Sequence, residues 1–134
     1  MLKLYTDGAC SPNPGLGGWA CIFYDNKNEP EKHCGYLENT TNNIMEITSV
    51  IKGLQYIKKY TNEVEILTDS LYVINTMTKG WKRNKNQDLW NQLDEELKNF
   101  TNIKWTWVKG HGNDLYNNIC DELAVQARIS KICY

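Results

Sequence analysis

Hydrophobic and polar positions along the chain follow two different periods, and the change from one to the other separates strands from helices. Residues 2–6, residues 19–24 and, more weakly, residues 33–38 are β-type runs joined by short polar segments. Three such runs in succession predict an antiparallel meander. The segment SPNPGLGG, residues 11–18, is rich in Pro and Gly and should interrupt any regular element between the first two runs.

The period then becomes that of a helix. From residue 43 to residue 60 the apolar side chains fall three and four positions apart, and Asn42 or Asn43 can cap the start of this helix. Further elements are expected as strands at 63–68 and 103–108 and as helices at 70–78, 88–100 and 117–130. Helices separate strands one, four and five, which favours parallel pairing through right-handed crossovers. The sequence therefore predicts an α/β fold, a single domain of 134 residues with a five-stranded mixed sheet and helices on both faces.

Composition and charge narrow the possible functions. Hydrophobic residues make up 41% of the chain and charged residues 23%, as in ordinary globular proteins. The formal net charge is −1, so attraction to nucleic acid must come from a local patch. No apolar stretch has membrane-spanning length and the N-terminus lacks a signal-peptide core, so we expect a cytoplasmic protein without a membrane partner.

The cysteines indicate reduced thiols. Their odd number, wide spacing and lack of any CxxC pair argue against a disulfide framework and against a zinc site. The five are Cys10, Cys21, Cys34, Cys120 and Cys133.

Four acidic residues occupy positions where carboxylates are uncommon. Asp7 and Asp69 each end an apolar β-type run, whereas Glu46 and Asp121 lie among the apolar residues of helical segments. A buried carboxylate is costly without a partner, and no Lys or Arg accompanies these four at a matching spacing. Strand ends of an α/β sheet form the usual ligand crevice, so the four can meet there around one or two divalent cations. Independent surface acids or helix caps explain each residue alone but explain all four together poorly.

Five segments of the chain resemble the characteristic segments of type 1 ribonuclease H, in that family's order. They are YTDGACSPNPGLGGW, NTTNNIMEI, ILTDSLYV, WVKGHGN and NNICDELA, and the resemblance extends from residue 4 to about residue 127. It implies a ribonuclease H-like fold and endonucleolytic cleavage of the RNA strand of an RNA–DNA hybrid, leaving 5′-phosphate and 3′-hydroxyl ends. It also implies two Mg²⁺ ions in the substrate complex, with Mn²⁺ as a substitute.

The resemblance assigns site residues by position. The metal-binding catalytic carboxylates are matched by Asp7, Glu46, Asp69 and Asp121. Asp7 is the expected bridging ligand between two cations. His111 matches a loop histidine that assists proton transfer or product release, although outside this motif an exposed histidine without a role would be the better interpretation.

The resemblance also assigns contacts to the hybrid. Besides Glu46, these are Gly8, Ala9, Cys10, Asn13, Asn42 and Asn43. The asparagines can serve turn and capping chemistry as well. Asn117 can orient a ligand near the site or cap the last helix. The segment 79–86 is a basic loop suited to tracking phosphates, although a solvated charge run is the alternative; its candidate residues are Lys79, Trp81, Lys82, Arg83 and Lys85.

Several features depart from the family pattern or stay outside the site. The basic loop is shorter than in many cellular relatives, and the sequence does not decide how this affects hybrid affinity. Leu71 stands where relatives often have a polar substrate-contacting residue, so that contact is expected to be lost. No separate hybrid-binding domain is expected, because the first catalytic strand begins at residue 2. Core packing is expected for most of the tryptophans Trp19, Trp90, Trp105 and Trp107, with the last two beneath helices on one face of a strand.

Three other functions compete with this interpretation. A DNA-strand transferase or junction nuclease would keep a carboxylate cluster but not the TTNNxME and WVKGH segments. A non-catalytic hybrid-binding module would have lost some of the four acids, and a structural domain leaves the acids unexplained. We expect a monomer, and the sequence does not decide whether the chain works beside a polymerase.

Overall fold

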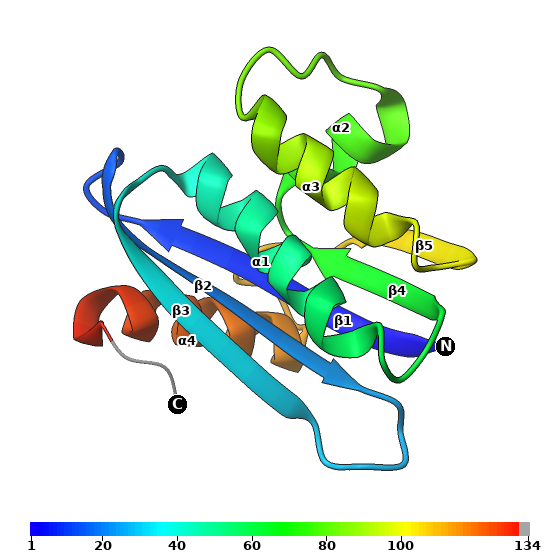
Figure 1. Ribbon diagram of the computed structural model, residues 1–134. Helices are drawn as coiled ribbons and strands as arrows, with labels where there is room; N and C mark the ends of the chain where they lie inside the picture. The colour runs from blue at the N-terminus through cyan, green and yellow to red at the C-terminus, as the bar shows by residue number, and fades with distance from the viewer. Residues whose placement is uncertain (132–134) are drawn as a thin grey trace.

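Five strands and four helices form the part of the chain, residues 1–131, that the computed structural model describes (Figure 1). In chain order they are β1 (Leu2–Cys10), β2 (Gly15–Tyr24), β3 (Glu31–Thr40), α1 (Asn42–Ile57), β4 (Glu63–Thr68), α2 (Leu71–Lys79), α3 (Gln87–Leu97), β5 (Asn102–Trp107) and α4 (Leu115–Ser130). This is the expected order of elements. Within residues 1–131, no helix combines the length and apolar character needed to cross a membrane.

The strands make one mixed sheet in the order β3-β2-β1-β4-β5. β1 pairs antiparallel with β2, and β2 with β3, as the meander requires. β1 pairs parallel with β4, and β4 with β5, across connections that contain helices. The predicted five-stranded mixed sheet is therefore confirmed, and β1 and β4, whose ends carry the expected acids, are direct neighbours.

The first three strands are longer than their apolar runs. β1 continues to Cys10 rather than ending at residue 6, and β2 begins at Gly15 rather than at residue 19. Only residues 11–14 are left for the turn, because Gly17 and Gly18 pair with Cys10 and Ala9 in the antiparallel ladder. The expectation that the whole of segment 11–18 breaks regular structure was wrong, since backbone pairing with a neighbouring strand outweighs the weak strand preference of glycine.

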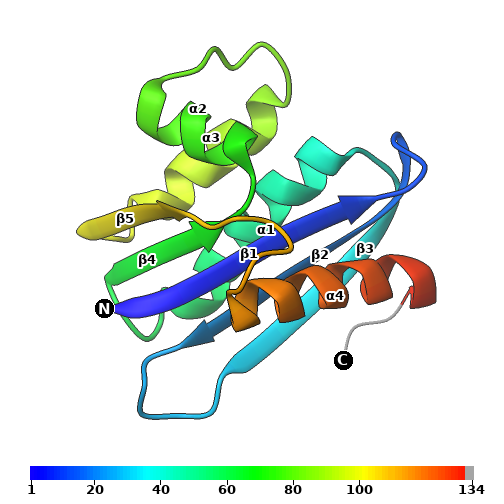
Figure 2. The ribbon, with the colours of Figure 1, turned by 180° about the vertical axis from the view of Figure 1, so that it is seen from behind.

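Helices cover both faces of the sheet, as expected. On one face α1, α2 and α3 enclose the larger core, which contains the buried side chains of Leu4, Ile66 and Trp90 (Figure 1). On the other face α4 packs over β1, β2 and β3 and encloses a smaller core around Tyr5 and Ile22 (Figure 2). Successive residues of β1, such as Leu4 and Tyr5, therefore point into different cores, as strand geometry requires.

Two helix caps differ from the expectation. The side chain of Thr41, not Asn42 or Asn43, accepts the capping hydrogen bond of α1. Asp114 caps α4, which therefore begins at Leu115 rather than at residue 117. In each case more than one nearby residue has a capping side chain, and the backbone conformation of the preceding loop selects one of them.

Two further expectations about side chains need correction. Trp19 and Trp90 are buried and Trp105 packs against the core, but Trp107 is 47% exposed because it lies at the end of β5, beyond the helices. Cys10, Cys21 and Cys120 are free and buried, whereas Cys34 is disulfide-bonded, against the expectation of reduced thiols. Cys133 lies outside the described residues.

Candidate metal and nucleic-acid site

Parallel pairing of β1 and β4 brings the first two acids together. Tyr5 is in register with Leu67, so Asp7 and Asp69, each two residues further on, reach the same edge of the sheet. The backbone at Asp69 is held from β5, since the indole N–H of Trp107 donates to its carbonyl oxygen at 3.2 Å. The residue that follows β4 is therefore tied to β5, on the side of β4 away from β1.

Glu46 joins these acids through a close approach of α1 to β1. Gly8 makes this approach possible, since a Cβ there would lie 2.5 Å from the backbone nitrogen of Glu46. The Gly8 N–H lies between two carboxylates and donates to Glu46 Oε1 and, at 2.9 Å, to Asp7 Oδ1. Glu46 belongs to the second turn of α1, because that helix begins at Asn42.

Three of the four expected acids form a tight group. One carboxylate oxygen each from Asp7, Glu46 and Asp69 lies within 4.8 Å of the other two, close enough to share a cation. Asp121, in the second turn of α4, is not part of this group but lines the same cavity. The cavity has a volume of about 560 Å³.

The cavity is built from four parts of the fold. It is lined by Asp7, Gly8, Ala9, Cys10 and Ser11 of β1 and its turn, Asn42, Asn43 and Glu46 of α1, Asp69, Ser70, Leu71 and Tyr72 at the start of α2, and Asp121, Val125 and Arg128 of α4. Five of the expected hybrid contacts, residues 8–10 and 42–43, are thus beside the acids. Asn13 is not a lining residue, but its side-chain oxygen accepts the Asn42 N–H at 3.2 Å.

Burial and mutual repulsion disfavour the ionised forms of the acids in this group. Burial raises the pKa of Asp7 and of Glu46, and the Glu46 carboxylate raises that of Asp7 further. Burial and the Asp121 carboxylate raise the pKa of Asp69, and the nearby Asn117 and His111 side chains offset part of that rise. A divalent cation would stabilise all of these carboxylates in their ionised form.

Unpartnered polar atoms point to the same conclusion. Asp7 Oδ2 is buried and has no hydrogen-bond partner among residues 1–131, although buried oxygens almost always have one. The amide of Asn117 is also buried near Asp69, and in the described part of the chain neither its nitrogen nor its oxygen has a hydrogen-bond partner of good geometry. Oxygen donors of this kind match the ligands that Mg²⁺ and Mn²⁺ prefer, so the residues present fit such a cation.

His111 lies in the loop that leads from β5 to α4. It is exposed, has a positive φ of 55°, and is close enough to lower the pKa of Asp69. Gly110 lies against the site, since a Cβ there would be 2.9 Å from Asp69 Oδ2. The loop ends at Asp114, which caps α4 and also accepts a hydrogen bond of 2.9 Å from the Tyr5 hydroxyl.

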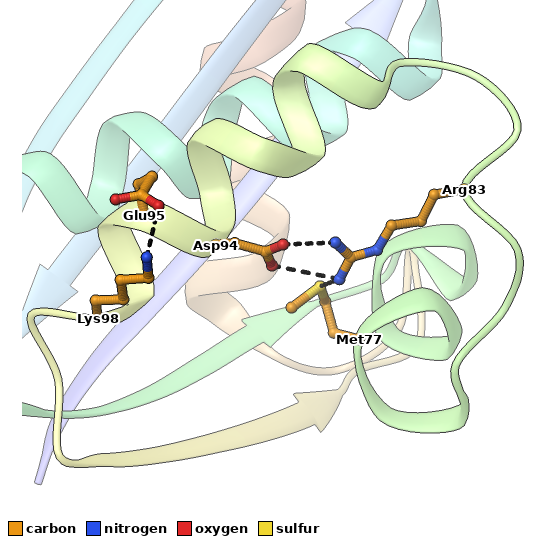
Figure 3. Close-up of polar contacts among 5 residues, drawn as sticks. All are labelled: Met77, Arg83, Asp94, Glu95 and Lys98. Carbon is orange, nitrogen blue, oxygen red and sulfur yellow. Dashed lines mark hydrogen bonds and ion pairs between the residues drawn. The ribbon is translucent and has the colours of Figure 1, made fainter.

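The basic loop lies apart from the acidic cavity. Lys79, Lys82 and Lys85 are exposed and Trp81 is 50% exposed, so these side chains can meet a partner. Arg83 differs from them because its guanidinium forms a bidentate ion pair with Asp94 of α3, with N–O distances of 2.6 and 3.3 Å (Figure 3). The same guanidinium also contacts the sulfur of Met77. Arg83 therefore anchors the loop, while the lysines point outward.

The sequence interpretation did not identify several cavity residues, notably Ser70, Tyr72 and Arg128. The spacing of Asp121, Val125 and Arg128, four and then three residues apart, places them on one face of α4 and could have found the arginine. Tyr72 carries no comparable signal. Its hydroxyl accepts a hydrogen bond of 3.2 Å from Asn86, which ties the basic loop to the cavity.

Comparison with known proteins identifies the family. The model of the RNase H family matches residues 1–129. The chain belongs to the ribonuclease H family. A ribonuclease H of Thermoanaerobacter sp. (strain X514) is 44% identical over 140 residues, covering 94% of this chain and 88% of its own. As a ribonuclease H, the chain is an enzyme of the nuclease class, as its sequence segments indicated.

Solved ribonucleases H have the same fold. RNase H1 from the archaeon Halobacterium salinarum NRC-1 superposes with a TM-score of 0.83 at 24% identity, covering 98% of each chain. LC11-RNase H1, solved in complex with an RNA/DNA hybrid, superposes with a TM-score of 0.83 at 22% identity, covering 98% of this chain and 99% of its own. At such identities the likeness establishes the α/β fold.

Proposed function

We propose that this ribonuclease H is an endonuclease that hydrolyses the RNA strand of RNA–DNA hybrids and leaves 5′-phosphate and 3′-hydroxyl ends. The observation that carries the proposal is the group formed by Asp7, Glu46 and Asp69, with carboxylate oxygens within 4.8 Å of one another at the edge of the sheet. LC11-RNase H1, which has the same fold, was solved in complex with an RNA/DNA hybrid, and this supports a hybrid as the substrate of the present chain. We expect the chain to act as a monomer in the cytoplasm.

The carboxylates would hold two divalent cations, Mg²⁺ or its substitute Mn²⁺. Asp7 has one oxygen bonded to the Gly8 N–H and one without a partner, which suits a ligand shared between two sites. Glu46 and Asp69, which form the tight group with Asp7, would complete one site, and Asp121 would contribute to the other. When bound, such a pair of cations supplies Lewis-acid activation of the attacking water and charge stabilisation for the departing oxygen.

The remaining residues would act directly on the substrate. His111 has an exposed imidazole on a glycine-flanked loop, so it can hold or release a proton near Asp69 as the product leaves. Asn42 and Asn43 present side-chain amides at the rim of the cavity, where hydroxyl groups of the RNA strand can be bound. The Lys79, Lys82 and Lys85 side chains would attract the backbone phosphates.

An Asp7→Asn variant tests this function. With a labelled hybrid and Mg²⁺, cleavage should fall by on the order of 10³-fold or more, because an essential charge opposite the cations is lost. Hybrid binding should persist. Glu122→Gln is the matched control, since Glu122 is an exposed acid next to Asp121 on α4, and it should cleave normally.

Parallel assays with duplex RNA and duplex DNA would define the substrate, and the end groups would be read from the products. Undiminished cleavage by the Asp7→Asn variant, or in excess chelator, would contradict the proposal. Hybrid binding by the unaltered chain without any cleavage would instead favour a non-catalytic hybrid-binding module.

A further inference from the structure

The wall of the acidic cavity contains an arginine that the site as proposed above does not use. Asp121, Val125 and Arg128 lie on one face of α4, and all three line the cavity. Seven residues of helix place Arg128 about 10 Å from Asp121 along the helix axis. The cavity therefore continues from the acid group to a guanidinium at the far end of α4.

The backbone of Arg128 is held firmly against the sheet. Gly18 of β2 lies directly beneath α4, since a Cβ there would be 2.1 Å from the carbonyl oxygen of Ala124 and 2.8 Å from the nitrogen of Arg128. This contact leaves α4 no room to shift toward β2. The position of the arginine relative to the acids is thus fixed by backbone packing.

Among the described residues, 1–131, the guanidinium of Arg128 makes one hydrogen bond and leaves its other donors free. Its Nη1 donates to the carbonyl oxygen of Ser11 at 3.3 Å, which turns the side chain toward the β1–β2 turn at the cavity rim. Within residues 1–131 it takes part in no ion pair, whereas Arg83 is engaged by Asp94. An arginine has five N–H donors in a planar fork, and that fork matches a phosphate group.

We propose that Arg128 binds a backbone phosphate of the hybrid beside the cleavage site. The inference rests on the proposed function and adds a specific contact to it. α4 lies on the opposite face of the sheet from α2 and α3, which flank the basic loop (Figures 1 and 2). The duplex would therefore be held by positive charge on both sides of the acid group, which itself repels phosphates.

Salt dependence of binding separates this role from a structural one. Arg128→Gln, combined with Asp7→Asn to prevent cleavage, should bind hybrid about tenfold more weakly, and the slope of log affinity against log salt concentration should decrease by about one. Arg128→Lys should keep the slope. Lys27→Gln is the matched control, because it removes one charge from the β2–β3 turn, outside the cavity lining, and should change neither quantity.

A single-phosphate scan would locate the contact. Hybrids in which one phosphate at a time is replaced by a neutral methylphosphonate should reveal a position that weakens binding by the parent but not by Arg128→Gln. In active enzyme, Arg128→Gln should raise KM and leave kcat nearly unchanged. A purely structural role through Ser11 would lower thermal stability without altering the salt slope.

The outcomes are distinguishable. Normal cleavage by the unaltered chain, together with an unchanged salt slope in the folded Arg128→Gln variant, would overturn this inference and leave the proposed function intact. Failure of the unaltered chain to bind hybrid in Mg²⁺ would overturn both, and binding without cleavage would overturn only the proposed function.

Discussion

The acidic cavity and the basic loop, two regions that this ribonuclease H would use on one substrate, are built in opposite ways. The cavity collects side chains from β1, α1, the β4–α2 junction and α4, and its acids are buried or half-buried. The basic loop is a single local segment, residues 79–86, whose lysines are exposed. One hydrogen bond, from Asn86 to the Tyr72 hydroxyl, connects the loop to the cavity lining.

This difference follows from what each region has to do. Cation ligands must hold their oxygens within a few tenths of an ångström, which requires packing from several elements. Attraction of phosphates acts over roughly a Debye length, about 8 Å at physiological salt, so the lysines need no fixed geometry. Substitutions should therefore be costly in the cavity and mild in the loop.

A pair of glycine substitutions should show the contrast most strongly. Gly8→Ala would bring a Cβ to 2.5 Å from the α1 backbone, and we expect it to lower the free energy of unfolding by about 3 kcal/mol. Gly80→Ala meets nothing within 4 Å and is penalised only by its positive φ, at about 1 kcal/mol. Urea denaturation measures both. Similar losses of stability in the two variants would contradict the idea that the cavity is more tightly packed than the basic loop.

The pH dependence of stability should distinguish the two regions next. Carboxyls whose pKa is raised in the folded state bind protons more tightly there, so their contribution is full below about pH 4 and is lost as pH rises toward the raised pKa. In chelator, the free energy of unfolding should fall by at least about 1 kcal/mol between pH 5 and pH 8.

Two comparisons assign this loss to the acid group. Mg²⁺ should restore stability at pH 8, and Asp7→Asn should make the metal-free protein less sensitive to pH. A Lys82→Gln/Lys85→Gln variant should keep the parent's pH profile. If all three proteins showed the same profile with and without Mg²⁺, the buried carboxylates would not be its source.

Removing charge from the basic loop should have a smaller effect, confined to substrate binding. The Lys82→Gln/Lys85→Gln variant should raise KM about three- to tenfold and leave kcat unchanged. The slope of log affinity against log salt concentration should decrease by up to about two. Lys52→Gln/Lys59→Gln on the α1 side removes the same charge from exposed positions and serves as control. A fall in kcat in the loop variant alone would mean that the loop does more than attract phosphates.

The smallest effect is expected at the Arg83–Asp94 ion pair. The side chains are 34% and 40% exposed, so a double-mutant cycle with Arg83→Gln and Asp94→Asn should give a coupling of about 0.5–1 kcal/mol in stability. The more exposed Lys98–Glu95 pair, also drawn in Figure 3, is the matched control and should give less. Equal coupling energies in the two pairs would mean that Arg83 does not specifically anchor the loop.

The order of elements and the convergence of acids on one cavity could be predicted from the sequence, because both follow from local patterns. Period-two and period-3.6 runs identify strands and helices, and Asp7 and Asp69 end neighbouring parallel strands. The sequence pattern could not predict the distances between the four acids. The tight group excludes Asp121, whose position depends on how closely α4 approaches β2 at Gly18.

The sequence pattern also could not predict which charged side chains form ion pairs. Lys82 and Arg83 are adjacent basic residues in the sequence, yet one is exposed and the other is bound to Asp94, eleven residues further on. Arg128 belongs to a helix far from the basic segment, so a count of neighbouring charges misses it. Contacts of this kind are set by tertiary packing, and the boundaries of strands and caps depend on it too.

The hydrogen bond from Tyr5 to Asp114 has a consequence for motion in the molecule. The loop that carries His111 is fastened at its start by the Val108 N–H on Thr68 and at its end by Asp114, which holds both Tyr5 and the first turn of α4. The turn that carries the imidazole is held as well, because the Gly112 N–H donates to the Lys109 carbonyl oxygen and the Asn118 side chain donates to the Gly112 carbonyl oxygen. The exposed His111 side chain can therefore change its direction relative to Asp69 by rotation about its own bonds, while the backbone that anchors it to β4 and α4 stays in place.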